Sequence, residues 1–276
     1  MSSLSPRDYA DLQAAIVKLE SQSFAMKLTS KVGMPIEALM HRLPHRAQNS
    51  IGAAVNKALE QCLRVALTLG RSHSSSVGRK RTHTLATAVT GAVGGFFGLP
   101  GLLVELPVTT TVILNAIAEI ARGQGEDLST PEGALACLEV LALGPEGLRT
   151  GPLESAYYAT RAALAQVTRD AATYVSQKGL AKESAPALVS FLAKIAARFG
   201  IEVSEKAAAQ LIPIVGAAGG LTLNVLFTDH FQRLAEGHFT VRRLERKYGS
   251  ALVQQEFQFA RASQFQRSFQ VVNGIR

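Results

Sequence analysis

The 276-residue sequence has no tryptophan, only two cysteines and few charged side chains, and each shortage narrows what the protein can be. Charged residues make up 18% of the chain, below the roughly 25% typical of soluble domains, and the mean hydropathy is +0.15. A hydrophobic content of 47% in a chain of this length supports a sizeable core. We therefore expect contact with lipid or with a partner surface.

The two cysteines lack the paired spacing of a zinc or redox motif. Cys62 and Cys137 lie in apolar helical patterns, which predicts reduced, buried thiols in a cytosolic chain. The N-terminal sequence MSSLSPRDYADLQ is polar and acidic, unlike a secretory signal. These features predict a protein that stays on the cytoplasmic side.

Motifs of the common enzyme classes are also missing. The sequence has no P-loop, nucleophile elbow, HExxH motif or dinucleotide-binding fingerprint. The turn GQGED is a poor phosphate cradle, because Glu126 and Asp127 would repel the anion. Nucleic acid is not expected as a partner, since the most basic stretch, RSHSSSVGRKRTH (71–83), has no interleaved aromatic residue for base stacking. The sequence leaves open whether the protein is an enzyme.

Strand patterns are nearly absent, whereas apolar residues recur every three to four positions from end to end. The sequence therefore predicts an all-α protein, a single bundle-like domain with Gly-rich apolar helical hairpins and no significant β-sheet. We expect residues 1–75 to form an N-terminal helical segment with short basic amphipathic pieces, broken at Pro35 and Pro44. Residues 76–276 should form a helical core that makes one compact unit with these helices.

Local signals place the helix ends. Ser5 and Pro6 suit the N-cap and first position of a helix to about residue 24, and Ser129 with Glu132 forms a capping box. The helix after this box carries Cys137. Further helices are expected at 45–70, 153–178, 183–199, 204–213, 215–236, 240–248 and 250–270, with Gly200 and Gly249 as C-terminal stops.

Two stretches are apolar enough to raise the question of a membrane. Residues 85–118 contain one charge, Glu105, and residues 207–228 contain none, so each exceeds the ~20 residues needed to cross a bilayer. Leu99-Pro100-Gly101 divides the first stretch and Pro213 interrupts the second. Three interpretations stay open: buried helical hairpins, shallow insertion by the Phe96–Pro100 tip, or true spans.

Positive charge is concentrated in the first half of the chain. The formal net charge is +8, and residues 1–125 carry 13 Lys and Arg against 7 Asp and Glu. Residues 71–83 form either an ordinary solvated connector or a contact for anionic lipid or phosphate. We predict that six residues contact a membrane or a partner: Arg79, Lys80, Arg81, Phe96, Phe97 and Leu99. The sequence TVRRLERKYG (240–249) is expected to be a solvated basic face open to an acidic partner.

Ionisable groups inside apolar helices must be paired, metal-bound or neutral. Such groups are Glu105, Glu119, Glu139, Asp229, His230 and His238. Structural roles are one explanation for them, for example an ion pair of Glu119 with Arg122. The alternative is a buried catalytic site of Glu105, Glu119, Asp229, His230 and His238, with a divalent metal held by His230, His238 and Asp229. No other cofactor is indicated.

Two long segments resemble a known family. FFGLPGLLVELPVTTTVILNAIAEIARGQGEDLSTPEGALACLEVLALG (96–144) is similar to the central segment of the bacterial EcsC family. SEKAAAQLIPIVGAAGGLTLNVLFTDHFQRLAEGHFTVRRLERKYG (204–249) is similar to its C-terminal segment. The likeness covers residues 80–250. The family is named after the third member of an operon that encodes an ABC exporter, so the resemblance implies an association with transport or secretion and no defined chemistry.

These observations predict a non-enzymatic accessory protein, peripheral to the cytoplasmic side of the inner membrane, that binds anionic lipid or a membrane complex. A metal-assisted hydrolase with the buried acid and histidine site is one alternative. A soluble helical scaffold that binds only proteins is another. The sequence does not indicate an oligomeric state.

Overall fold

The computed structural model describes residues 3–20, 24–32, 35–41, 43–69, 98–144, 155–179, 184–210 and 213–273. These residues form α-helices and one short 3₁₀ helix and contain no strand, which confirms the predicted all-α fold. The elements are α1 (Pro6–Leu19), α2 (Phe24–Val32), α3 (Ile36–Met40), α4 (His45–Leu69), α6 (Gly98–Gly123), α7 (Pro131–Glu139), η1 (Val140–Ala142), α8 (Ala156–Lys178), α9 (Pro186–Gln210), α10 (Pro213–Tyr248) and α11 (Ser250–Asn273).

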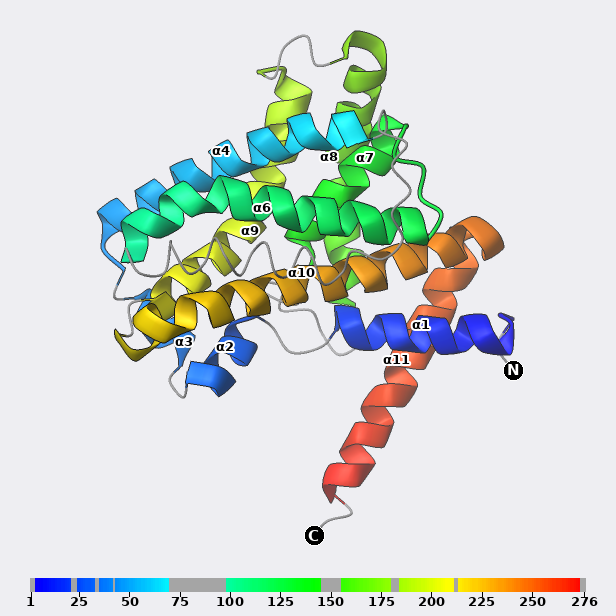
Figure 1. Ribbon diagram of the computed structural model, residues 1–276. Helices are drawn as coiled ribbons and strands as arrows, with labels where there is room; N and C mark the ends of the chain where they lie inside the picture. Colours follow the sequence, from blue (N-terminus) through cyan, green and yellow to red (C-terminus); the bar gives the residue numbers. More distant parts are fainter. Residues whose placement is uncertain are drawn as a thin grey trace.

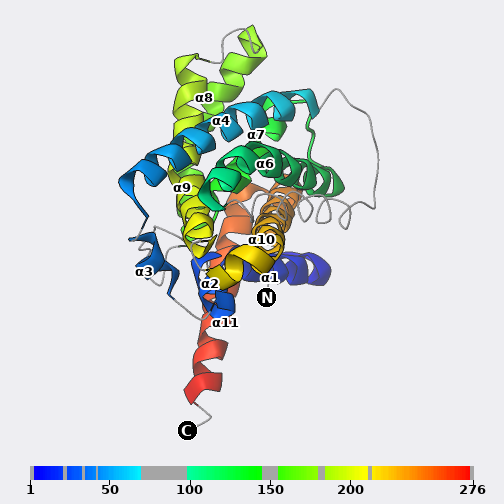
Figure 2. The same ribbon diagram turned by 60° about the vertical axis from the view of Figure 1, so that its left-hand side comes forward.

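Helix α6 lies at the centre of the bundle (Figure 1). Helix α4 packs along one side of it and α10 along another, while α9 crosses behind and contacts α4, α8 and α10. Helix α1 packs against α10, so the N-terminal residues belong to the same core as the rest. Turning the molecule shows α11 leading away from the bundle toward the C-terminus (Figure 2).

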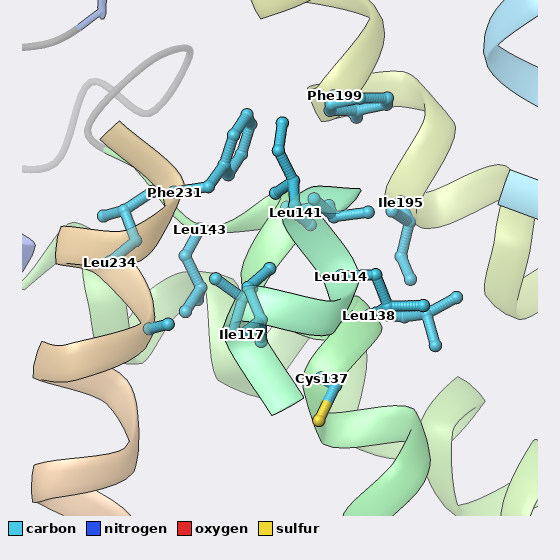
Figure 3. Packing of buried hydrophobic residues seen from close by; sticks show 14 of the residues in the cluster. Leu114, Ile117, Cys137, Leu138, Leu141, Leu143, Ile195, Phe199, Phe231 and Leu234 are labelled. Carbon is cyan, nitrogen blue, oxygen red and sulfur yellow. The ribbon is translucent and has the colours of Figure 1, made fainter. Parts of the chain in front are cut away.

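The core is built mainly from branched aliphatic and phenylalanine side chains at helical spacing. Figure 3 shows Leu114 and Ile117 of α6 facing Leu138 of α7, with Phe199 of α9 and Phe231 of α10 closing the cluster. All five are fully buried. Both cysteines are buried too, as predicted, and burial raises the pKa of each thiol to about 12.

The helix-start predictions succeed in one case and miss by one residue in another. Ser5 caps α1, its Oγ accepting the backbone N–H of Asp8 at 3.2 Å. At α7 the cap is Thr130, whose Oγ1 accepts the N–H of Gly133 at 3.1 Å. The predicted capping box at Ser129 is wrong because Pro131 occupies the first helical position, which makes the residue directly before it the cap.

Two predicted helix breaks do not occur. Helix α9 continues through Gly200, and α10 runs unbroken from Pro213 to Tyr248 through Gly237. A Cβ atom at Gly237 would lie 2.6 Å from Leu19 Cγ, so this glycine allows α1 to approach α10 closely. Gly249 does end α10, with a φ of +89°.

The apolar stretch around α6 is only partly described. Helix α6 begins at Gly98, so Leu99, Pro100 and Gly101 lie in its first turn, where a proline needs no N–H partner. The predicted division at these residues is therefore a helix start. Among the described helices, only Leu103–Gly123 is long and apolar enough to cross a membrane, and half of that stretch is buried in protein. Residues 85–97 lie outside the described part.

Candidate functional site

Buried polar side chains from α6, α9 and α10 meet inside the bundle. Apart from Lys27 of α2, which reaches the same place, each is less than 9% exposed. Burying so many polar groups is costly unless they satisfy one another, so their contacts decide what the cluster can do. We call this set the polar cluster. It consists of two groups on neighbouring turns of α9, one with Lys206 and the other with Glu202: Glu105, Thr109, Lys206 and Asn224, and Lys27, Glu202 and His230.

Glu105 is held by two hydrogen bonds and one ion pair. Thr109 Oγ1, one turn along α6, donates to Glu105 Oε1 at 3.0 Å, and Asn224 Nδ2 of α10 donates to the same oxygen at 2.5 Å. Lys206 Nζ of α9 lies 3.7 Å from that oxygen. The carboxylate therefore connects three helices.

Lys206 is completely buried and has an unusual environment for a lysine. Its Nζ lies 4.9 Å from the centre of the Phe227 ring, and it forms no hydrogen bond within the described residues. Burial lowers the pKa of Lys206 to about 8, although the charge of Glu105 acts in the opposite direction. The ion pair with Glu105 also fixes α9 against α6.

His230 uses both of its ring nitrogens within the cluster. Lys27 Nζ lies 3.4 Å from Nδ1, and because an ammonium group can only donate, Nδ1 must accept. Nε2 then carries the proton and donates to Glu202 Oε1 at 3.4 Å. Burial, with the charge of Lys27, lowers the pKa of His230 to about 3, so the ring is neutral. Neither nitrogen has a lone pair free for a metal.

His238 lies in a different environment, against α8. Arg161 Nη1 donates to the Tyr157 hydroxyl oxygen at 3.3 Å, so the hydroxyl proton is directed to His238 Nδ1, 3.1 Å away. Burial lowers the pKa of His238 well below its usual range. The ring packs edge-on against Tyr157 and Phe239. This histidine is a packed, neutral core residue.

The five candidate site residues therefore do not converge. Asp229 is about half exposed and pairs with Arg233, at 2.9 Å, on the outer face of α10. Glu119 lies on the partly exposed face of α6. Within the described residues, no three His, Cys, Asp or Glu side chains come close enough to hold a metal ion. Binding a metal through His230 would require it to give up Lys27 or Glu202, whereas His238 Nε2 has no hydrogen-bond partner within the described residues.

The basic sequence 240–249 is not the solvated face predicted from its composition. Arg242 donates to Glu126 Oε2 at 3.0 Å, and Arg246 pairs with the same carboxylate. Burial alone would raise the pKa of Glu126, but the two arginines outweigh it and lower that pKa. Arg243 pairs with Asp11, at 2.7 Å. These side chains hold α10 to the α6–α7 turn and to α1, so most of their charge is used internally.

The predicted membrane-contact residues lie mostly outside the described part of the chain. This holds for Phe96 and Phe97 as well as for the basic residues 79–81. Leu99 lies in the first turn of α6, and its side chain is not described. Just after it, Val104 and Val108 are 79% and 48% exposed. Sequence periodicity alone did not identify this exposed pair, because the face of α6 that contacts the bundle is equally apolar.

Comparison with known families gives one match. The EcsC protein family matches residues 10–244, which is most of the chain. The chain belongs to the EcsC family. The match includes most of α1 and all of α2, where the sequence resemblance did not reach. No curated protein and no solved structure matches this EcsC protein, so its assignment goes no further than the family.

Proposed function

We propose that this EcsC protein is a non-enzymatic accessory of transport or secretion that binds the cytoplasmic surface of an anionic bacterial membrane. The start of α6 and the basic segment before it would make the contact. The observation that carries the proposal is the exposed pair Val104 and Val108, which lie one helical turn apart directly after the Phe96–Leu99 sequence. Exposed apolar side chains gathered at one place mark a surface for lipid or for a partner.

The outer face of α6 changes character along its length. It is apolar at Val104 and Val108, and becomes polar at Asn115 and Glu119, which are partly exposed. Such a gradient suits a helix whose first turns enter the interface while its last turns stay in water.

Peripheral contact is favoured over a full crossing because of the inner face of α6. On that face Glu105 is bound to α9 and α10 through Lys206 and Asn224. Crossing a bilayer would break these contacts and expose the charges to hydrocarbon, which is costly. Insertion limited to the first turns leaves them in place.

Electrostatic attraction between basic residues and anionic lipid adds a second contribution to the free energy of membrane binding. Arg79, Lys80 and Arg81 precede α6 in the sequence, and each basic residue near an anionic surface contributes about 1 kcal/mol. This contribution weakens with salt, because the Debye length falls from about 10 Å at 0.1 M to about 3 Å at 1 M. Burial of the valine side chains, about 2–3 kcal/mol for the pair, is not screened.

Liposome flotation of matched variants tests the proposal. Wild-type protein should float with liposomes that contain anionic lipid, float weakly with neutral ones, and be partly released by 1 M salt. Val104→Ser with Val108→Ser should weaken salt-resistant binding roughly 30- to 150-fold. Val189→Ser, at an exposed valine of α9, is the matched control and should bind like the wild type. Replacing residues 79–81 by serine should remove the salt-sensitive part.

The result that would overturn the proposal is equally direct. If folded wild-type protein ignores both kinds of liposome at low salt, the membrane function is wrong, and the exposed valines serve a protein partner or none. If the double variant and the Val189 control lose binding equally, α6 is not the contact. Because Val104 and Val108 are exposed, their replacement should leave the melting temperature nearly unchanged, which circular dichroism checks.

A further inference from the structure

Side chains of α7, α8 and the residues on either side of the α10–α11 junction line a groove. Its volume is about 500 Å³, within the range of roughly 300–1,000 Å³ found for small-molecule sites. Helix α8 lines it over three turns, from Tyr158 to Arg169, and Ala162 and Ala165 leave space between the longer side chains. None of the residues proposed above for membrane contact belongs to it.

Most of the charge that lines the groove is already paired. Arg161 donates to Glu245 through both Nη atoms, at 2.7 and 2.9 Å. Arg242 is paired with Glu126, which does not itself line the groove. A ligand anion would have to displace one of these carboxylates, so these two arginines do not make a ready anion site.

Glu139 is the exception. It lies at the end of α7, is 8% exposed, and lines the groove. Its Oε1 accepts the Thr168 hydroxyl at 2.5 Å, and no lysine or arginine of the described chain forms an ion pair with it. Burial raises the pKa of Glu139, although the Thr168 hydroxyl and the charges of Arg242 and Arg161 act in the opposite direction. A positive ligand group would give this carboxylate a direct ion-pair partner.

A second acid extends the site toward the mouth of the groove. Glu132 is seven residues before Glu139 on the same face of α7, about 10 Å away along the helix axis. Arg169, also at the mouth, donates to Gln166 of its own helix at 2.9 Å. Three acids and three arginines line the groove. Because Arg161 is paired with Glu245 and Arg242 with Glu126 outside the lining, the two acids of α7 are opposed only by Arg169.

We propose that this groove binds a small linear aliphatic amine, with one ammonium group against Glu139 and Thr168, the carbon chain along Ala162 and Ala165, and a second ammonium group near Glu132. The Glu139 carboxylate and the Thr168 hydroxyl oxygen would accept hydrogen bonds from the first ammonium group. The two alanines offer the apolar surface that the chain needs.

Spermidine is a suitable probe for isothermal titration calorimetry of the full chain at pH 8 and low salt. The protein carries a net charge of +8, so unspecific attraction of a polycation is disfavoured and measurable binding indicates a local site. Wild-type protein should bind one spermidine. Glu139→Gln, which keeps an acceptor for Thr168, should weaken binding roughly 10- to 100-fold. Glu60→Gln, an exposed position on α4, makes the same change in net charge and should have no effect.

A variant that leaves every charge in place provides a second test of the amine site. Ala165→Phe fills the groove from the exposed face of α8 and should abolish spermidine binding while the far-UV spectrum stays unchanged. Three results would overturn the proposal: no spermidine binding by the wild type at millimolar concentration, equal weakening by Glu139→Gln and Glu60→Gln, or tighter binding of citrate than of spermidine. Each can occur whether or not the protein binds membranes, so the two proposals are tested separately.

Discussion

The replacement of Glu105 by glutamine tests the electrostatics of the polar cluster. At the 3.7 Å between Lys206 Nζ and Glu105 Oε1, and an effective dielectric constant of about 20, the attraction is about 4 kcal/mol. Burial lowers the pKa of Lys206 from 10.5 to about 8 even with this attraction. Holding the charged lysine at pH 7 therefore already costs the folded protein about 3 kcal/mol.

Without the carboxylate, Lys206 would lose about three further pKa units and titrate near pH 5 in the folded variant. Its folded pKa would then lie far below the unfolded value, so the contribution of this group to stability falls as the pH drops from 10.5 to about 5. In the wild-type protein, the cost of holding Lys206 charged stops growing once the pH is below about 8. The variant should thus be less stable by about 1–2 kcal/mol at pH 7 and by about 4 kcal/mol at pH 5.

Urea denaturation, followed by circular dichroism at pH 5, 6 and 7, measures this difference. Glutamine keeps the shape and an acceptor for Thr109 and Asn224, so packing changes little. In a Lys206→Met background the same replacement should not cost about 4 kcal/mol at pH 5, because no lysine remains to titrate. A cost that is constant between pH 5 and 7 in the Lys206 background would refute the buried ion pair.

Two further predictions concern packing and pH. Gly237→Ala places a Cβ atom 2.6 Å from Leu19 Cγ and should lower the free energy of unfolding by about 1–3 kcal/mol, whereas Gly200→Ala has open space and should raise it by about 0.5–1 kcal/mol. If urea denaturation shows the same change in the free energy of unfolding for both variants, the close approach of α1 to α10 is wrong. Burial lowers the pKa of His230 to about 3, so stability should fall as the pH drops below 6.5, by about 3 kcal/mol at pH 4.5. His230→Gln should remove that part of the pH profile, and an unchanged profile would contradict the buried, neutral histidine.

Local chemistry explains which parts of the fold could be predicted. The N-cap at Ser5 and the stop at Gly249 depend on a few neighbouring residues, and both were correct. Helix ends were expected at Gly200 and between the predicted helices 215–236 and 240–248, where Gly237 lies, and neither occurs. A glycine inside a helix can serve a contact with a distant element, as Gly237 does with Leu19, and sequence spacing does not reveal that contact.

The candidate site was predictable only in part, for the same reason. Glu105 and His230 stood out as ionisable residues in apolar runs, and both do lie in the polar cluster. Lys206 was missed, although it is the last charge before the uncharged stretch 207–228, because its partner Glu105 is about a hundred positions away. Arg242 was assigned to solvent because its partner Glu126 lies 116 positions earlier in the chain.

Whether the start of α6 enters lipid decides the proposed function, and a single labelled cysteine measures this directly. Cys62 and Cys137 are fully buried with thiol pKa values raised to about 12, so a maleimide should label only an introduced thiol in the folded protein. With an environment-sensitive dye at Val104→Cys, we predict a blue-shifted, brighter emission on adding anionic vesicles. A dye at Phe259→Cys, an exposed position on α11, should not respond. No shift at position 104, or equal shifts at both positions, would contradict membrane binding through α6.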